Sequence, residues 1–381
     1  MEQHSKAVTS RRTKPKNHSE LTVHPIKTAV VGLGMMGSSQ IRNCLWKLPQ
    51  YEITAVCDPF APNLDTCRAL FTERGLPVAC FSDLSEMLQQ ADCELVVIAS
   101  PDYTHEQIAC DCLRAGKHIR LEKPLAITPE GCANIQRAHT EGGKLLQIGL
   151  ELRYASPTRR MQAWLPRLGE LKMLTCEEFR PPFLPKRGLV NDWITKKAYT
   201  GGTLLEKNCH HFDLFNWFAA SRPVQVYASG DGLVEYRDTD ILDNAFVTVE
   251  YENGIHAMLS LCLFAPKKIA GSSLNELEMG LIGNRGRLEL RGDDVLVWDR
   301  ATGEEERWHY ARENTEAHSD DIIPSMIELA DCIRNGGEPL TGIQAGINSA
   351  LVSFAAERSA EQKRIVTIDE LESESGLRFI V

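Results

Sequence analysis

The chain has 381 residues, 43% of them hydrophobic and 25% charged, which is ordinary for a globular protein and long enough to favour two domains over one. Its formal net charge of −10 argues against nucleic acid as the main partner, because a phosphate backbone requires a basic face. Twelve cysteines without a CxxC pair indicate reduced thiols in a cytoplasmic protein, and no apolar run reaches the roughly 18 residues of a membrane span.

Residues 1–24 are polar and basic, and we expect a flexible N-terminal arm, or an arm that becomes ordered against a partner subunit. The pair Arg11-Arg12 faintly resembles a twin-arginine export signal. No apolar segment follows it before the first predicted strand, so the sequence argues against export.

Residues 25–148 have the pattern of a doubly wound parallel α/β sheet that binds a dinucleotide. The apolar run IKTAVVGLG at 26–34 leads into the GxGxxG turn GLGMMG, and a helix-like segment follows. Gly32 permits the tight bend, Gly34 lets the backbone approach a pyrophosphate, and Gly37 lets the helix pack on the strand. Met35 and Met36, at the start of that helix, join the three glycines as candidate cofactor contacts.

The next predicted strand, ITAVC, ends at Asp58. A carboxylate at this place can accept hydrogen bonds from both ribose hydroxyls of NAD, and it repels the 2′-phosphate of NADP. Neither Arg nor Lys follows directly to hold that phosphate, so we predict NAD as the cofactor.

Further strands are predicted at ELVVIAS (94–100), HIRL (118–121) and KLLQIG (144–149). Ligands of parallel sheets bind at the carboxyl ends of the strands. Residues at these ends are therefore expected to face the cofactor crevice: Ser100, Pro101, Asp102, His105, Glu122 and Lys123.

Lys123 stands between a glutamate and a proline at the end of a strand. It is either a solvated surface lysine or a functional one that Pro124 aims into the cleft. Beside an oxidised nicotinamide, a positive neighbour and partial burial would both lower its pKa. Such a lysine could orient a substrate hydroxyl and help to carry its proton.

After Gly149 the pattern changes to that of a second α/β domain, residues 149–381. Asn-Gly and Gly-Asn turns join strand-like runs and indicate an antiparallel sheet. The runs are KMLTCEEFR, VQVYASGDG, ILDNAFVTVEYENGIHAMLSLCLFA, LNELEMGLIGNRGRLELRG and VLVWD. Helices are predicted at LELRYASPTRRMQAWLPRLG, DIIPSMIELADCIRNGG and AGINSALVSFAAERSAEQK.

The stretch LLEKNCHHFDLFNWF, residues 204–218, is predicted to be a helix. At about 100° per residue, one arc of roughly 60° carries Glu206, His210, Asp213 and Trp217, while His211 points elsewhere and Phe212 and Phe215 pack. The polar arc admits three interpretations: a metal site, a structural hydrogen-bond network, or a general base, His210, oriented by Asp213 with Glu206 nearby. We favour the general base and expect no metal, because nothing nearby completes a zinc shell.

Together, GLGMMG, Asp58, EKP at 122–124 and GG…ExxxHxxD at 201–213 resemble the Gfo/Idh/MocA oxidoreductases over residues 26–370. The resemblance implies a Rossmann domain followed by an α/β domain whose large open sheet often forms oligomer contacts, and hence a homo-oligomer, dimer or tetramer. It also implies Lys123 and His210 as the catalytic pair, with Asp213 beside them.

The sequence departs from the common family pattern at Glu206, where many members have aspartate, and this puts the substrate contacts in doubt. Selectivity is expected in the loop RPPFLPKRGLVNDW. Candidate substrate residues, besides Lys123, Glu206 and His210, are Arg153, Tyr154, Arg180, Lys186, Asn191 and Trp193. For Trp193 packing is the alternative, and for Arg180 and Lys186 the alternative is solvated surface charge.

The sequence thus predicts an NAD-dependent dehydrogenase that oxidises a secondary hydroxyl of a sugar, cyclitol or sugar derivative. Its expected partner is a small carbohydrate or polyol, without nucleic acid or membrane. One alternative is a glycoside-cleaving enzyme that oxidises, eliminates and re-reduces its substrate with tightly held NAD. Another is a non-catalytic sensor of NAD(H), since a fold alone does not establish an activity.

Overall fold

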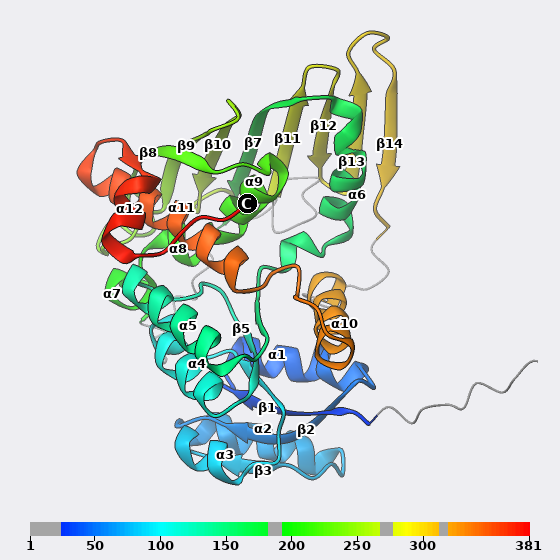
Figure 1. Ribbon diagram of the computed structural model, residues 1–381, viewed down its shortest axis with the longest axis vertical. Coiled ribbons are helices and arrows are strands. Elements are labelled where there is room, and N and C mark those ends of the chain that lie inside the picture. Colours follow the sequence, from blue (N-terminus) through cyan, green and yellow to red (C-terminus); the bar gives the residue numbers. More distant parts are fainter. Residues whose placement is uncertain (1–23, 182–192, 267–276, 312–318) are drawn as a thin grey trace, which may run out of the picture.

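The computed structural model describes residues 24–181, 193–266, 277–311 and 319–381, which form two sheets stacked along the long axis of the molecule (Figure 1). The first sheet has the strand order β3-β2-β1-β4-β5-β6, and all of its pairs are parallel. Its strands are β1 Ile26–Val31, β2 Tyr51–Cys57, β3 Ala79–Phe81, β4 Leu95–Ile98, β5 His118–Leu121 and β6 Leu146–Ile148.

Helices connect these strands in the way a doubly wound sheet requires. They are α1 Met35–Asn43, α2 Ala61–Glu73, α3 Leu84–Gln90, α4 His105–Arg114 and α5 Pro129–Gly142, with the short 3-10 turns η1 Leu45–Lys47 and η2 Asp102–Thr104. The central strand β4 is buried along its whole length because helices cover both of its faces. The predicted parallel sheet is confirmed, although the short edge strand β3 was not predicted.

The second sheet has nine strands in the order β14-β13-β12-β11-β7-β10-β9-β8-β15. Its pairs are antiparallel except β7 with β10, which run parallel. The strands are β7 Leu171–Phe179, β8 Pro223–Asp231, β9 Asn244–Tyr251, β10 His256–Cys262, β11 Leu277–Gly283, β12 Gly286–Arg291, β13 Asp294–Asp299, β14 Glu305–His309 and β15 Val366–Thr367. The mostly antiparallel architecture is therefore confirmed, with β14 and β15 as additions.

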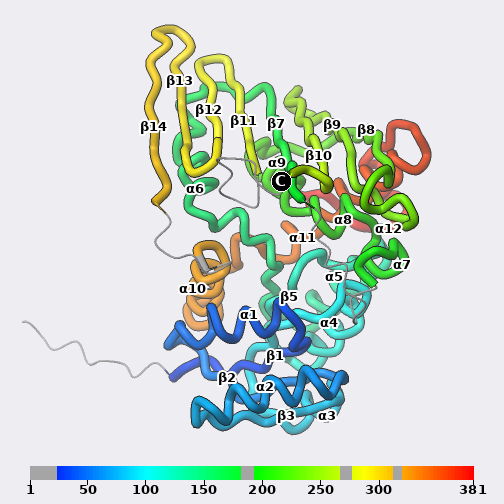
Figure 2. Tube along the Cα trace, turned by 180° about the vertical axis from the view of Figure 1, so that it is seen from behind, coloured from blue at the N-terminus to red at the C-terminus, as the bar shows by residue number. Residues whose placement is uncertain are grey.

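Helices cover one face of the second sheet, and β9 shows the consequence (Figures 1 and 2). Its residues alternate between buried and exposed, as expected when one face meets the core and the other does not. The remaining helices are α6 Ser156–Trp164, α7 Lys197–Thr200, α8 Thr203–Glu206, α9 Cys209–Ala219, α10 Ser319–Asn335, α11 Ile343–Gln362 and α12 Ile368–Ser375, with the 3-10 turns η3 Glu151–Arg153 and η4 Leu165–Leu168.

Helix α10 packs on the first sheet although it follows the second sheet in the chain (Figure 1). Ile322, Met326 and Leu329 share one apolar cluster with Val30 and Val56 of strands β1 and β2. The two units are therefore tied together by a returning helix as well as by the chain between β6 and β7, which limits how far they can move apart.

Candidate active site

The glycine turn after β1 has the shape that a pyrophosphate requires. Gly32 has a φ of 85°, and a Cβ there would lie 2.6 Å from the Ala99 carbonyl oxygen. A Cβ on Gly37 would lie 1.9 Å from the Gly32 oxygen, whereas a Cβ on Gly34 would meet nothing within 4 Å. The turn is therefore closed toward the protein and open at Gly34, where α1 begins, so these residues fit a dinucleotide.

Asp58 is held in place at the end of β2, beside the glycine turn. Its carboxylate accepts hydrogen bonds from the Leu33 amide at 2.7 Å, the Phe60 amide at 2.8 Å and the Asn63 side chain at 3.0 Å. These donors fix the orientation of the carboxylate before any ligand binds, which is the arrangement needed to read a ribose. Asn63 was missed in the sequence because nothing in its spacing marks it.

His105 ties two crevice loops together and does not face the crevice. Its side chain is fully buried, with Nδ1 2.7 Å from the Pro124 oxygen and Nε2 3.1 Å from the Ser100 oxygen. Burial lowers the pKa of His105 to about 4, so the ring is neutral at pH 7 and donates to only one of the two carbonyls. The predicted cofactor contact of His105 is thus replaced by a role in positioning Ser100 and Pro124.

Lys123 meets Glu206 across the boundary between the two units. Its Nζ donates to Glu206 Oε1 at 2.6 Å and to the Glu206 backbone oxygen at 2.7 Å. Burial on its own would lower the pKa of Lys123, but the charges of Glu206, Cys209 and Asp102 and the hydrogen bond to Glu206 together outweigh burial and raise it. In the protein alone Lys123 is therefore a charged donor, and the lowering of its pKa beside an oxidised nicotinamide stays a prediction.

The predicted helix 204–218 is broken. Helix α8 ends at Glu206 and α9 starts at Cys209, with a turn at Lys207 and Asn208. The helical phase that grouped Glu206 with His210 therefore does not apply across the break. The prediction that Phe212 and Phe215 pack is confirmed, since both are fully buried.

The carboxylate beside His210 is Glu151, not Asp213. His210 Nε2 lies 3.5 Å from Glu151 Oε1, and both side chains are buried. The Asp213 carboxylate instead accepts two hydrogen bonds from Arg153, one from Nε at 2.7 Å and one from Nη2 at 2.6 Å. The expectation that Asp213 orients His210 is wrong, and Glu151, from a turn far away in sequence, was not foreseen.

His211 belongs to a separate buried cluster around Glu178. Its Nε2 lies 3.5 Å from Glu178 Oε2, and its Nδ1 lies 3.2 Å from the Asn208 amide nitrogen. Burial lowers the pKa of His211, which leaves the ring neutral at pH 7. The two adjacent histidines, which are consecutive residues of α9, therefore have different neighbours, as predicted.

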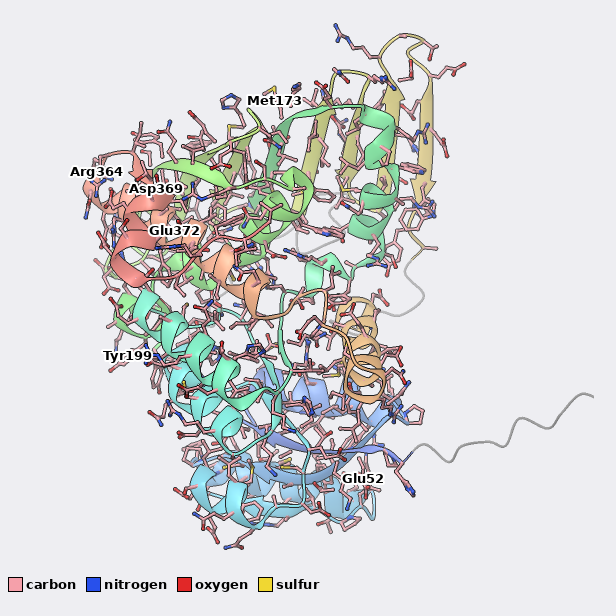
Figure 3. All side chains as sticks on the ribbon, viewed as in Figure 1. Glu52, Met173, Tyr199, Arg364, Asp369 and Glu372 are labelled. Atoms are coloured by element: carbon pink, nitrogen blue, oxygen red, sulfur yellow. The ribbon has the colours of Figure 1, made fainter. Side chains whose placement is uncertain are left out.

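Several candidate substrate residues are used by the protein itself. Arg153 is occupied by Asp213, and the Tyr154 hydroxyl donates to Glu328 in the interior, so both predictions of a substrate contact are unsupported. The Trp193 ring lies 6.1 Å from that of Tyr103, whose ring also packs at a tilt of 52° against Tyr199, labelled in Figure 3. Lys186 and Asn191 lie outside the described residues.

Two crevice carboxyls come from the ends of β4 and β5. Glu122 accepts a hydrogen bond from Gln40 of α1, which links that strand end to the glycine-turn helix. Asp102 is 6% exposed, and its Oδ2 has no hydrogen-bond partner among the described residues. Burial raises the pKa of Asp102 well above its usual value, and the Glu206 carboxylate adds to this effect. Asp102 is thus a buried acid beside Lys123.

Other kinds of site find no support in the part of the chain that the structure describes. Within it, no group of three or more His, Cys, Asp and Glu side chains could hold a metal ion. None of its helices is long and apolar enough to cross a membrane. All twelve cysteines are free.

A glycine turn that fits a dinucleotide, in a chain that also pairs a lysine with a glutamate between its two sheets, is typical of nucleotide-dependent oxidoreductases. Residues 26–150 match a family model described as an oxidoreductase family with an NAD-binding Rossmann fold, and residues 166–368 match the model of its C-terminal alpha/beta domain. The chain belongs to the Gfo/Idh/MocA oxidoreductase family, which confirms the resemblance noted in its sequence.

Individual relatives agree with this assignment. Inositol 2-dehydrogenase of Azotobacter vinelandii is 33% identical over 154 residues, which are 40% of this chain and 45% of that protein, so the match spans less than half of the relative's length. Myo-inositol 2-dehydrogenase of Thermotoga maritima is 23% identical over 91% of this chain and 99% of its own. The WlbA dehydrogenase from Bordetella pertussis, solved with NADH and UDP-GlcNAcA, shares the fold with a TM-score of 0.75 at 22% identity, covering 90% and 98% of the two chains.

Replacing Asp102 with asparagine tests its buried, protonated state. Because the folded-state pKa is raised above the unfolded value of about 3.9, the folded protein binds more protons between the two values, and its stability falls as pH rises through that window. Asp102→Asn removes this loss, so the variant should exceed the wild type in unfolding free energy by about 1–3 kcal/mol at neutral pH, with a smaller difference near pH 4. Urea unfolding across this range measures it, with the exposed Asp65→Asn as control. Parallel pH curves for wild type and Asp102→Asn would contradict the assignment.

Proposed function

We propose that this protein is an NAD-dependent dehydrogenase that oxidises a secondary hydroxyl of a sugar, cyclitol or sugar derivative. The observation that carries the proposal is the pairing of Lys123 with Glu206 at the carboxyl end of a sheet that belongs to the NAD-binding Rossmann family; His210 of α9 is buried against Glu151. Names of relatives such as inositol 2-dehydrogenase support a polyhydroxylated substrate.

In the proposed reaction each residue has a separate task. Lys123, held charged by Glu206, donates a hydrogen bond to the reacting hydroxyl and stabilises the negative charge that develops on its oxygen. His210 takes the hydroxyl proton as general base, and Glu151 beside it stabilises the imidazolium that forms. NAD, when bound, accepts the hydride from the carbon.

We propose NAD rather than NADP on the evidence of Asp58. Its carboxylate is fixed by three donors beside the turn that fits the pyrophosphate, and its negative charge would repel a 2′-phosphate. Gly32, Gly34 and Gly37 would hold the pyrophosphate, with Met35 and Met36 at the start of α1. Ser100, Pro101 and Asp102 would border the nicotinamide end, near Lys123.

We also propose a homo-oligomer formed through the uncovered face of the second sheet. Outward residues of β7, β8, β9 and β10 expose apolar side chains there, and Met173 is labelled in Figure 3. The exposed fractions are 64% for Phe246, 46% for Met173, 44% for Tyr227, 39% for Met258 and 36% for Phe179. Large apolar side chains exposed on an uncovered sheet face are typical of a protein–protein interface.

The catalytic pair is tested by substitution. Lys123→Ala and His210→Ala should each lower kcat by about 100-fold or more, because each removes a group that acts on the reacting hydroxyl. His211→Ala should have a milder effect, since His211 contacts Glu178 instead. NADH formation from polyols, aldoses and cyclitols is the measurement. A larger loss for His211→Ala than for His210→Ala would reverse the assignment.

A glycoside-cleaving enzyme would release product without stoichiometric NADH, and a sensor would bind NAD without any turnover.

The cofactor assignment is tested at Asp58. Asp58→Ala should lower the preference for NAD over NADP by about 10- to 100-fold, the loss expected for hydrogen bonds to a charged group. Affinities for both cofactors are measured by fluorescence titration, with Asp65→Ala on the exposed side of α2 as control. An unchanged preference in Asp58→Ala would show that Asp58 does not read the ribose.

The interface is tested at its most exposed aromatic residue. Wild-type protein should run as a dimer or tetramer in size-exclusion light scattering, and Phe246→Arg should shift it to smaller species because a charge cannot be buried unpaired. The matched change Leu233→Arg, at a residue 51% exposed outside the strands, should leave the mass unchanged. A monomeric wild type would rule the interface out.

A further inference from the structure

Strand β4 ends in the middle of the carboxyl edge of the first sheet. It pairs with β1, which leads into the glycine turn, and with β5, which leads to Lys123. The end of β4 packs on the glycine turn, since a Cβ on Gly32 would lie 2.6 Å from the Ala99 oxygen. The turn η2 follows and begins at Asp102. Asp102 therefore belongs to a strand end that lies between the glycine turn and Lys123.

This part of the edge would face the nicotinamide half of the cofactor. Asp58 follows β2, which lies on the other side of β1 from β4. A dinucleotide with its pyrophosphate at the glycine turn and its adenosine ribose at Asp58 must extend its other half over the ends of β4 and β5. The nicotinamide ring carries a positive charge when oxidised and none when reduced. Charged groups at these two strand ends would therefore distinguish the two forms of the cofactor.

Three carboxyl groups gather around Lys123 in the described part of the chain. Asp102 and Glu122 are buried, and the Glu206 side chain is 16% exposed. Lys123 donates to Glu206 Oε1 at 2.6 Å and to its backbone oxygen at 2.7 Å, whereas Glu122 accepts from the neutral Gln40. Asp102 thus has two acidic neighbours, and the lysine that attracts its charge is already paired with one of them.

The Asp102 carboxyl group lacks the donors that a buried carboxylate needs. It is 6% exposed, and its Oδ2 has no hydrogen-bond partner among the described residues. A buried oxygen without a donor destabilises the charged form of an acid. Burial first, then the charges of Glu206 and Glu122, raise the pKa of Asp102 well above its usual range, against the opposing effect of Lys123. In the free protein the proton therefore stays on Asp102.

Other titratable groups of the described residues lie on the elements packed around Asp102 and Glu206: His105 of α4, Cys209 of α9, Lys197 and Tyr199 of α7, and Lys207 after α8. Burial lowers the pKa of His105 to about 4 and raises that of Cys209, so both are neutral at pH 7. Lys197 lies 3.3 Å from the buried Glu357, and Lys207 lies 3.3 Å from the buried Glu178. The Tyr199 ring packs against that of Tyr103. The neutral groups add no charge, and both lysines have carboxylates of their own.

We propose that Asp102 couples cofactor binding to a proton: it keeps its proton in the free protein and in the complex with NADH, and releases it to solvent when oxidised NAD binds. The O–H bond of the carboxyl group breaks, and the carboxylate that remains attracts the positive ring. Attraction between charges acts across several ångströms and needs no direct contact. The inference rests on the proposed function, because it places the nicotinamide beside Lys123.

Calorimetry counts the proton. Each cofactor is titrated into the protein in two buffers of different ionisation enthalpy, between about pH 5 and pH 9. Oxidised NAD should release up to about one proton more than NADH does. The ratio of the two dissociation constants should change in favour of oxidised NAD as pH rises, by up to about 10-fold per pH unit within the window where the proton is released. Equal proton release by both cofactors, or release by neither, would overturn the proposal.

Variants assign the proton to Asp102. Asp102→Asn, which cannot ionise, should abolish the difference in proton release. It should bind oxidised NAD about 10-fold or more weakly than the wild type at pH 9, and within about twofold of it at pH 5. Asp65→Asn is the control, because Asp65 is an exposed carboxylate 2.7 Å from Arg68, and it should release the proton as the wild type does.

Two results with Asp102→Asn would contradict this assignment. Proton release that persists in the variant would give the proton to another group, such as Lys123. Equal weakening of both cofactors at every pH would leave Asp102 with a structural role alone.

Turnover separates this inference from the proposed function. NADH formation from a sugar or cyclitol, without extra proton release when oxidised NAD binds, would support the dehydrogenase and reject the role of Asp102. Proton release on binding of oxidised NAD, without NADH formation from any sugar, cyclitol or other polyol, would support the role of Asp102 and reject the dehydrogenase.

Discussion

The ion pair between Lys123 and Glu206 is the constraint on which the rest of the site depends. Lys123 ends a strand of the first sheet, and Glu206 ends helix α8 beside the second, so the pair exists only when both units are folded and docked. It also decides the chemistry available to Lys123. A buried lysine without a carboxylate would tend to lose its proton, whereas this one stays charged and acts as a donor.

Buried charge elsewhere around helix α9 follows the same rule of pairing. Asp213 accepts hydrogen bonds from Nε and Nη2 of Arg153. Glu178 lies within ion-pair distance of Lys207 and Arg180 and accepts a hydrogen bond from the Asn208 side-chain amide. Removing one partner of such a pair leaves an uncompensated charge and is costly, by about 3–5 kcal/mol for buried pairs. These pairs keep a helix rich in polar groups inside the core, and they hold His210 near Glu151 without recruiting Asp213.

The first sheet could be predicted from the sequence because the patterns that indicate it lie close together in the chain. A buried apolar strand, a glycine turn and a carboxylate at the next strand end lie within about one βαβ unit, and each has one dominant physical reason. The break in the helix at Lys207 and Asn208 could not be predicted from the sequence. The hydrophobic pattern of residues 204–218 stays helical across this short turn, so nothing in the pattern marks the break. Glu151 was missed because it reaches His210 from a segment distant in sequence, and no spacing rule connects the two residues.

The sequence by itself determined the two-sheet α/β architecture and the glycine turn after the first strand, because these depend on short-range patterns of glycine and hydrophobicity. Only the tertiary structure decided which carboxylate meets which base. Ion pairing in a buried site acts over a few ångströms and is therefore set by packing. In the folded chain Arg153 pairs with Asp213, Glu151 lies beside His210, and Glu206 pairs with Lys123.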